Sequence, residues 1–284
     1  MPLKLRITTS DLAERLRDRA FLRVKALRQQ LRPRSGIPQS VFVSGVQRSG
    51  TNMLMDILEA SYETDVFHET DVRAFDDYAM REETVIESLI AQSNAPVVVV
   101  KALLEAHRVT GLMEHFAPAK ALWMIRSFED SVNSTVKRWP GNRNDIDRIV
   151  DDRDAGDWRG LGMTLETQEI VRKHYNPQMN DASANALFWY YRNQLYFDQR
   201  LDTEPRVLPV NYEELVSHPD LFVDSIATFL GIKATDRMRR VSHTESVRKS
   251  PAPDIAPDVH ELCEAMQRRL DQAVKAQRVA LGAG

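Results

Sequence analysis

The sequence predicts an α/β fold in which a parallel sheet is flanked by helices on both faces, with extra helices at the N- and C-termini. Three observations predict it. Short apolar segments without polar alternation recur along the chain, as in strands that are buried on both faces. Helical patterns separate these segments, which is typical of parallel sheets. The first segment also runs into a glycine-containing loop that opens a helix. The chain has 284 residues, enough to bury one large core.

The individual elements follow from the apolar patterns in chain order. Strands are expected over residues 41–44, 97–100, 121–125 and 206–210, and the second of these is four valines in a row. Helices are expected over about 51–60, 127–138 and 219–230, with a closing amphipathic helix over 259–279. Trp189, Tyr190 and Tyr191 are expected to fill the core rather than to stack on a ligand.

The first 36 residues are expected to form a basic amphipathic helix and a linker, followed by one domain over residues 37–284. This segment holds ten Lys and Arg against three acidic residues, whereas the remainder holds 28 basic and 38 acidic residues. Apolar residues at three- and four-residue steps predict a helix over 11–32; they are Leu12, Leu16, Ala20, Val24, Leu27 and Leu31. Such a helix either contacts an anionic membrane surface or a partner, or packs on the domain with a solvated basic face.

The bulk properties exclude several classes of protein. The net charge of −3 gives no reason to expect nucleic-acid binding, and the single cysteine, Cys263, allows no intrachain disulfide. No apolar run approaches the roughly 20 residues of a membrane span, and the N-terminus lacks the apolar core of a secretory signal. We therefore expect a cytoplasmic protein, and peripheral contact with a membrane or an anionic polymer through the N-terminal helix stays open beside the packed alternative. The sequence does not predict an oligomeric state.

The loop after the first strand has the features of a P-loop-like phosphate site. Gly45 and Gly50 permit close backbone approach, and the helix that follows presents unpaired N–H groups with a positive dipole. Arg48 adds a positively charged guanidinium with several N–H donors, beside the hydroxyl and amide donors of its neighbours. A Walker loop needs Lys after the second glycine, where this chain has Thr51, so ordinary ATP or GTP hydrolysis is disfavoured. A tight strand–helix turn with a capping hydroxyl is the alternative.

This loop resembles a known nucleotide-binding motif. Residues 48–52 (Arg48, Ser49, Gly50, Thr51 and Asn52) are similar to the 5′-phosphosulfate loop of sulfotransferases that use PAPS (3′-phosphoadenosine-5′-phosphosulfate), usually Lys/Arg-Ser-Gly-Thr-Thr. Arginine in the first position resembles the tyrosylprotein and many bacterial members, and Asn52 departs from the second Thr but keeps a donor. The resemblance implies that these residues bind PAPS, with PAP as the product.

Two later segments extend the resemblance over roughly residues 41–232. Residues 123–134 are similar to the family's 3′-phosphate segment, which implies that Arg126 and Ser134 bind that phosphate. A structural ion pair of Arg126 with a helix-start acid is the alternative. Residues 211–216 are similar to the family's Tyr-Glu-Asp-Leu, which implies that Tyr212 lies near the nucleotide. Arg248, in a late basic cluster, is assigned to the 3′-phosphate, with a plain basic turn as the alternative.

The catalytic residues are inferred from the same resemblance. Glu69 follows Arg48 by 21 residues, as the catalytic glutamate does in tyrosylprotein-type members, and is expected to act as the general base. Lys101 resembles the lysine that follows the second strand and is expected to stabilise the transition state with Arg48. Small-molecule members use a histidine two residues later, where this chain has Leu103; His68 and His107 are the fallback bases. No His/Cys/Asp cluster has metal-ligand spacing, and the reaction is expected to need no metal.

Sulfuryl transfer from PAPS to a hydroxyl acceptor is therefore the predicted function. The acceptor stays open among glycan, lipid, peptide and small molecule, because acceptor pockets are built from loops without short motifs. Residues 140–162 are expected to form either a mobile lid or a plain surface excursion. Two other functions remain: a P-loop nucleotide kinase or NTPase, and a non-catalytic module that binds PAP or sulfate.

Overall fold

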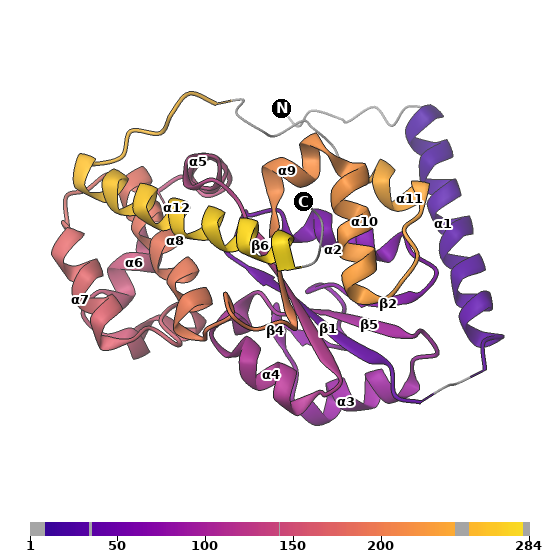
Figure 1. Ribbon diagram of the computed structural model, residues 1–284. Helices are drawn as coiled ribbons and strands as arrows, with labels where there is room; N and C mark the ends of the chain where they lie inside the picture. The colour runs from indigo at the N-terminus through magenta and orange to yellow at the C-terminus, as the bar shows by residue number, and fades with distance from the viewer. Residues whose placement is uncertain (1–8, 34–35, 142, 242–249, 281–284) are drawn as a thin grey trace.

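The computed structural model describes residues 9–33, 36–141, 143–241 and 250–280. A central sheet lies between two layers of helices (Figure 1). Its five strands are all parallel and run in the order β2-β5-β1-β6-β7. They span Gln39–Gly45 (β1), Thr64–Phe67 (β2), Val97–Lys101 (β5), Ala119–Ile125 (β6) and Val207–Asn211 (β7). The predicted fold class and its four strands are confirmed.

The edge strand β2 is the one strand of this sheet that the sequence did not predict. It has only four residues, two of them the polar Thr64 and Asp65, so it lacks the apolar run of its neighbours. A two-stranded hairpin of β3 (Phe75–Asp76) and β4 (Ala79–Met80) follows it. The chain leaves β2 after Phe67, and two residues later Glu69 contacts Lys101 at the carboxyl end of β5.

Alternate residues of each strand face two separate apolar layers, which explains why the strands are apolar throughout. Val41 and Val43 of β1 pack into the layer that contains α2 (Thr51–Glu59) and α10 (Pro219–Leu230). Phe42 between them packs into the opposite layer, together with α4 (Val109–His115) and α8 (Asp181–Asp198). The remaining described helices are α1 (Thr9–Gln30), α3 (Glu83–Gln92), η1 (Leu104–Arg108), α5 (Phe128–Arg138), α6 (Asn144–Ile149), η2 (Arg153–Arg159), α7 (Leu165–His174), α9 (Tyr212–Ser217), α11 (Asp236–Arg240) and α12 (Pro257–Ala280).

The five helices expected from the sequence are present within a few residues of their predicted ends. They correspond to α1, α2, α5, α10 and α12. Helix α8 was not predicted as a helix, because it is buried nearly all round and shows no apolar stripe. Its Trp189, Tyr190 and Tyr191 are all buried in the core, as expected. Helix α12 crosses α8, and both lie on the same side of the sheet (Figure 1).

In the described part of the chain, residues 140–162 form a folded segment that packs on the rest of the protein. It contains α6 and η2, and Ile146 and Ile149 of α6 are fully buried. Arg143 pairs with Asp147 within the segment and donates to the Met179 carbonyl at 2.7 Å. These contacts favour the reading of a packed excursion. Residues of the segment also line a cavity together with Gln47 of the loop after β1.

Within the described residues, no helix has the length and apolar character needed to cross a membrane. Helix α1 packs along the sheet edge formed by β2, close to α11 (Figure 1).

Candidate functional site

The loop between β1 and α2 has a backbone that only glycine permits at two positions. Gly45 has φ +142°, and an added Cβ would lie 2.6 Å from the Met124 carbonyl oxygen. Gly50 has φ +101° and caps α2, and its Cβ would lie 2.3 Å from the Tyr212 ring. The loop is therefore pressed against β6 and against the start of α9. Its Ser49 hydroxyl is buried and has no hydrogen-bond partner among the described residues, which suits a ligand oxygen.

A cavity of about 440 Å³ opens above this loop, at the carboxyl ends of the parallel strands. This is the edge where ligands of open α/β sheets bind. We call it the donor cavity. Most of the site residues predicted from the sequence line it, namely Arg48, Gly50, Thr51, Asn52, Glu69, Lys101, Arg126, Ser134 and Tyr212. Ser49 lies in the same loop without lining the cavity, and Arg248 lies outside the described residues.

Two arginines from distant segments meet in the donor cavity. Arg126 follows β6 and donates from Nη1 to the Arg48 carbonyl at 3.1 Å. Arg48 donates from Nε to the Ser134 hydroxyl of α5 at 3.0 Å. The loop arginine, the strand-end arginine and the helix serine therefore form one connected cluster, although 86 residues separate Arg48 from Ser134.

Arg126 is held in place from several sides. Its guanidinium carbon lies 4.4 Å from the Tyr212 ring centroid, and its Nη2 lies 3.9 Å from the Asp130 carboxylate. The alternative of an ion pair with a helix-start acid is thus present, but this pair is long and leaves the side chain facing the cavity. Tyr212 contacts both Arg126 and Gly50, so it fixes the distance between the loop and the strand end.

The charge of the site is positive and incompletely neutralised. Burial, followed by the nearby Arg126 and Arg138 charges, lowers the pKa of Arg48 from its ordinary value, although an arginine stays charged at neutral pH. Like charges packed this closely raise the free energy of the empty cavity, and a bound anion relieves that repulsion. The donor cavity is thus electrostatically suited to a polyanion in a chain that is acidic beyond residue 36.

Glu69 and Lys101 lie together on the other side of the loop. The Lys101 ammonium is 2.6 Å from a Glu69 carboxylate oxygen and also donates to the Asn52 side chain. Lys101 is 2% exposed, and this burial lowers its pKa, with the Glu69 hydrogen bond opposing the shift. Glu69 keeps 22% of its side chain exposed, so it can be reached from the cavity. The two side chains expected to act in catalysis are therefore in direct contact.

Helix α5 contributes two residues that the sequence reasoning missed. Asn133 and Lys137 line the donor cavity together with Asp130 and Ser134. Positions 130, 133, 134 and 137 follow three- and four-residue helical spacing, so they share one face of α5. Once Ser134 had been assigned to a phosphate, this spacing could have identified Asn133 and Lys137.

A second cavity of about 650 Å³ adjoins the donor cavity, and both are lined by Gln47 and Trp139. We call it the side cavity. Its lining includes aromatic residues (Trp139, Trp158, Phe188 and Trp189) and polar residues such as Asp145 and Asn185. The Gln47 amide and the Ser131 hydroxyl are buried at this wall without hydrogen-bond partners among the described residues. The side cavity is assembled from the loop, α5, the 140–162 segment and α8, so no short motif could have predicted it.

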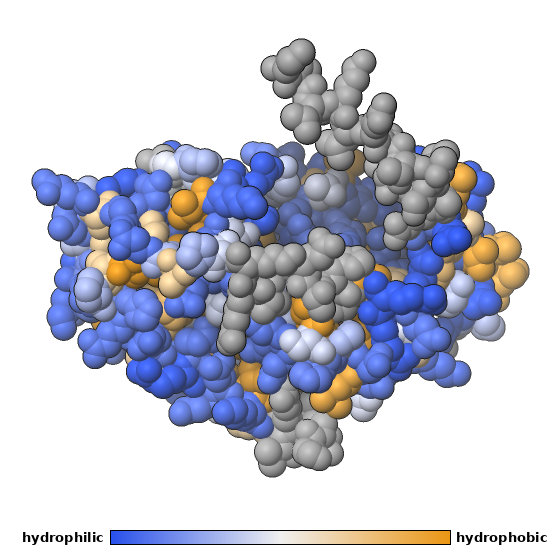
Figure 2. Space-filling view, turned by 90° about the horizontal axis from the view of Figure 1, so that it is seen from above, coloured by the Kyte–Doolittle hydropathy of each residue, from blue (hydrophilic) through white to orange (hydrophobic). Residues whose placement is uncertain are grey.

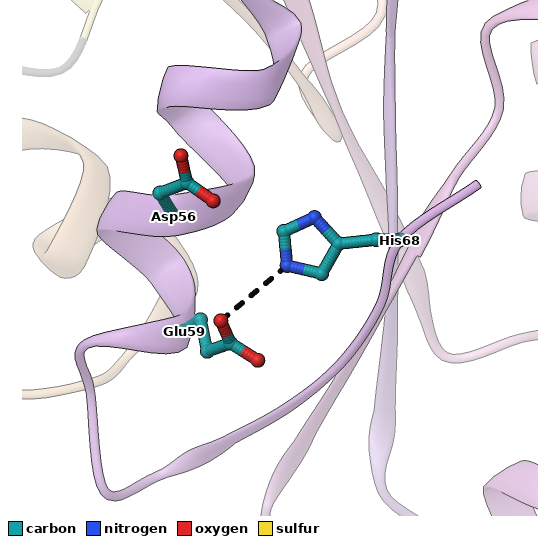
Figure 3. Close-up of side chains that lie close together, drawn as sticks. All are labelled: Asp56, Glu59 and His68. Atoms are coloured by element: carbon teal, nitrogen blue, oxygen red, sulfur yellow. Dashed lines mark ion pairs between the residues drawn. The ribbon is translucent and has the colours of Figure 1, made fainter. Parts of the chain in front are cut away.

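A cluster of Asp56, Glu59 and His68 lies under the segment that carries Glu69. The imidazole points between the two carboxylates of α2, and its Nε2 is 3.5 Å from Glu59 (Figure 3). The ligand atoms of all three residues lie within 4.8 Å of one another, so the group could hold a divalent cation. The sequence shows no His/Cys/Asp cluster with metal-ligand spacing, and spacing does not reveal this group because two residues one helical turn apart meet a third that is distant in sequence.

The same cluster explains how Glu69 is supported. The Glu59 carboxylate, 3.5 Å from the imidazole, raises the pKa of His68, burial opposes this, and the imidazole in turn lowers the pKa of Glu59. The resulting ion pair fastens the residue before Glu69 to α2. Burial, followed by the nearby Arg192 charge, lowers the pKa of His107 to about 4, so His107 is neutral at physiological pH. Neither histidine is among the residues that line the donor cavity.

The geometry agrees with the comparison to known proteins. A family model described as the sulfotransferase domain matches residues 38–253. No curated protein sequence matches the chain. Among solved structures, a sulfotransferase from Alicyclobacillus acidocaldarius is 17% identical, with 85% of this chain and 96% of that chain covered and a TM-score of 0.48. A sulfotransferase from Mycobacterium avium is 14% identical, with coverages of 92% and 82% and a TM-score of 0.49.

A mouse sulfotransferase whose structure contains PAP is 12% identical, with coverages of 88% and 90% and a TM-score of 0.48. These structural likenesses are distant, and the assignment rests on the family match, which extends over most of the chain, from the first strand past β7. The chain belongs to the sulfotransferase family.

Proposed function

We propose that this protein transfers a sulfuryl group from PAPS to a hydroxyl group of an acceptor. The observation that carries the proposal is the single donor cavity lined by both Arg48 and Arg126. A nucleotide with phosphates at both its 3′ and 5′ positions needs two cationic sites within one cavity, and charge-assisted hydrogen bonds from arginine forks suit both. The mouse relative that was solved with PAP supports the same nucleotide here.

The donor would be held at both ends. The loop residues Arg48 to Asn52, with the N-terminus of α2, would bind the 5′-phosphosulfate. Arg126 and Ser134 would bind the 3′-phosphate, with Lys137 as an additional cation on the same face of α5. The buried, unpartnered Ser49 hydroxyl and the close contacts of Gly50 support this assignment, because both fit a loop that wraps an oxyanion. Arg248 remains a proposed 3′-phosphate ligand on the strength of the family resemblance alone.

The chemistry requires a proton acceptor and cations at the reacting centre. PAPS supplies an activated sulfuryl group, whose S–O bond to the 5′-phosphate breaks as the acceptor oxygen forms a new S–O bond. Glu69 accepts the proton of the acceptor hydroxyl, and its carboxylate is reachable from the cavity. Arg48 and Lys101 stabilise the negative charge that develops between sulfur and the departing phosphate oxygen. Asn52 keeps the Lys101 ammonium in place beside Glu69.

The acceptor is proposed to bind in the side cavity. A lining that contains both aromatic residues and amide and carboxylate side chains suits a hydroxylated ring such as a saccharide, because aromatic rings can stack on its apolar C–H face while polar groups bind its hydroxyls. The unpartnered Gln47 amide carries both a donor and an acceptor at the junction of the two cavities. A hydroxyl group satisfies both at once, so Gln47 is suited to direct an acceptor hydroxyl toward Glu69.

The test is transfer of radiolabelled sulfuryl from PAPS to matched panels of saccharides, phenols and open-chain alcohols. The proposal predicts labelled saccharide and stoichiometric PAP, with no dependence on ATP. PAP binding without transfer to any panel would indicate a non-catalytic module, and magnesium-dependent ATP turnover would indicate a kinase or NTPase. Trp158→Ala, in the side cavity alone, should raise the KM for the acceptor and leave PAP affinity unchanged. An unchanged KM for the acceptor would show that the acceptor does not bind in this cavity.

A further inference from the structure

Helix α1 is attached to the rest of the protein by the side that the sequence pattern would have left in solvent. Surface helices normally bury their apolar stripe and expose their polar side. Here the apolar positions that predicted the helix are mostly exposed: Leu16 is 56%, Leu27 is 55% and Leu31 is 76% exposed. The inner side of α1 is instead largely polar, and this inversion needs a physical explanation.

The inner side of α1 is fixed by specific polar contacts. Lys25 is 5% exposed, and its ammonium donates to the Glu59 carbonyl at 2.7 Å, at the end of α2. The Gln29 amide donates to the Thr64 carbonyl of β2 at 2.7 Å. Burial lowers the pKa of Lys25 to about 8, a cost that nearby carboxylates partly offset. Phe21 adds an apolar contact, with its ring 4.7 Å from that of Tyr62. These contacts set which side of α1 faces outward.

The outward side carries a row of exposed apolar residues that we call the outer stripe. It consists of Leu16, Ala20, Val24, Leu27 and Leu31, all exposed and spaced by three or four residues. Such spacing places them one above another along a single side of the helix. In Figure 2 apolar side chains appear at the right-hand edge of the molecule, where α1 lies in Figure 1. A contiguous exposed apolar surface marks a binding surface more often than scattered single leucines do.

Arginines border the outer stripe along its length. Arg17, Arg19 and Arg23 are exposed, and none of them pairs with a carboxylate among the described residues. The neighbouring Asp18 is engaged by Arg237 at 2.5 Å. Viewed down the helix at 100° per residue, Arg19 and Arg23 fall on one border of the stripe and Arg17 on the other. An apolar stripe with cationic borders is the arrangement of helices that lie in a membrane interface.

We propose that α1 docks this protein on an anionic membrane surface through the outer stripe, with its arginines against lipid phosphates. A second copy of the chain is the competing occupant. A symmetric pairing of two outer stripes would bring arginine borders together, and like charges at such an interface are unfavourable. An anionic bilayer can bury the leucines in its apolar region and pair the arginines with lipid phosphates at the same time. The proposal concerns attachment and is independent of the transfer reaction.

The experiment is co-sedimentation of the full chain with vesicles of phosphatidylcholine, with and without phosphatidylglycerol. We expect binding to the anionic vesicles only, and weaker binding at higher salt. An arginine near an anionic surface contributes about fivefold to affinity, so R17Q/R19Q/R23Q should weaken binding about 100-fold. L16Q/L27Q should weaken it by about tenfold or more per leucine that inserts.

The matched control is L165Q/L221Q, which removes two leucines that are equally exposed elsewhere, at 67% and 59%. This control should bind vesicles like the unmodified chain, and circular dichroism should show that every variant remains folded. Binding that survives both α1 variants overturns the proposal, as does an unmodified chain that ignores anionic vesicles. A dimer in size-exclusion chromatography that L16Q/L27Q converts to monomer, without vesicle binding, would assign the outer stripe to a second copy instead.

Discussion

Replacing Arg126 by alanine should weaken the binding of PAP and should leave the binding of adenosine 5′-phosphate nearly unchanged. Arg126 is 7% exposed, so little water would replace its contacts with a phosphate. A hydrogen bond to a charged group contributes about 1.5–3 kcal/mol, so losing a two-pronged contact removes about 3 kcal/mol or more. Part of that is offset because Arg126 also interacts with Asp130 and with the Arg48 carbonyl. We therefore expect a loss of about 100-fold in PAP affinity.

Isothermal titration calorimetry with the two nucleotides isolates the contribution of the 3′-phosphate. A general collapse of the loop would weaken both ligands equally, whereas loss of a 3′-phosphate contact weakens PAP alone. Arg126→Lys keeps the positive charge but loses the two-pronged guanidinium contact. Its affinity for PAP should therefore lie between those of the alanine variant and the unmodified chain. Arg268→Ala, on the exposed side of α12, is the control and should change neither affinity. Equal losses for both nucleotides, or no loss for PAP, would refute the assignment of Arg126.

Three further changes probe the reacting centre, the loop and the support beneath Glu69. Glu69→Gln should lower turnover by about 100- to 10,000-fold while PAP affinity stays constant in calorimetry; normal turnover would move the base elsewhere. Gly50→Ala places a Cβ 2.3 Å from the Tyr212 ring, so PAP affinity should fall about 10- to 100-fold, and an unaffected affinity would show that the loop can relax. The raised pKa of His68 means that its ion pair with Glu59 stabilises the fold below pH 6.5 and that this gain is lost as pH rises through the folded-state pKa. The lowered pKa of Glu59 makes its own contribution fade as pH falls below 4.5. Glu59→Gln should therefore lower the melting temperature most between these two pH values, and an equal loss at alkaline pH would contradict the ion pair.

The sequence was sufficient for the elements whose environment is uniform along the chain. The strands β1, β5, β6 and β7 are buried on both faces, so each appears as an unbroken apolar run. The phosphate loop was predictable because its glycines and donors are contiguous. Arg126 and Ser134 were identified through the resemblance of residues 123–134 to the family's 3′-phosphate segment, and both line the donor cavity.

Features built from distant segments could not be predicted in this way. The side cavity joins α5, the 140–162 segment and α8, and the Asp56–Glu59–His68 cluster depends on how α2 packs against the end of β2. Helix α8 lacks a polar side that would reveal its period. The outer stripe of α1 was visible as a pattern, but its outward orientation is decided by the polar contacts of Lys25 and Gln29.

The most direct test of the central claim is a crystal structure of the protein with PAP. We expect one nucleotide in the donor cavity, with its 5′-phosphate on the loop from Gly45 to Asn52 and its 3′-phosphate on Arg126 and Ser134. A nucleotide bound elsewhere, or one whose 3′-phosphate leaves Arg126 without contact, would contradict the claim that a single cavity holds both ends of the donor.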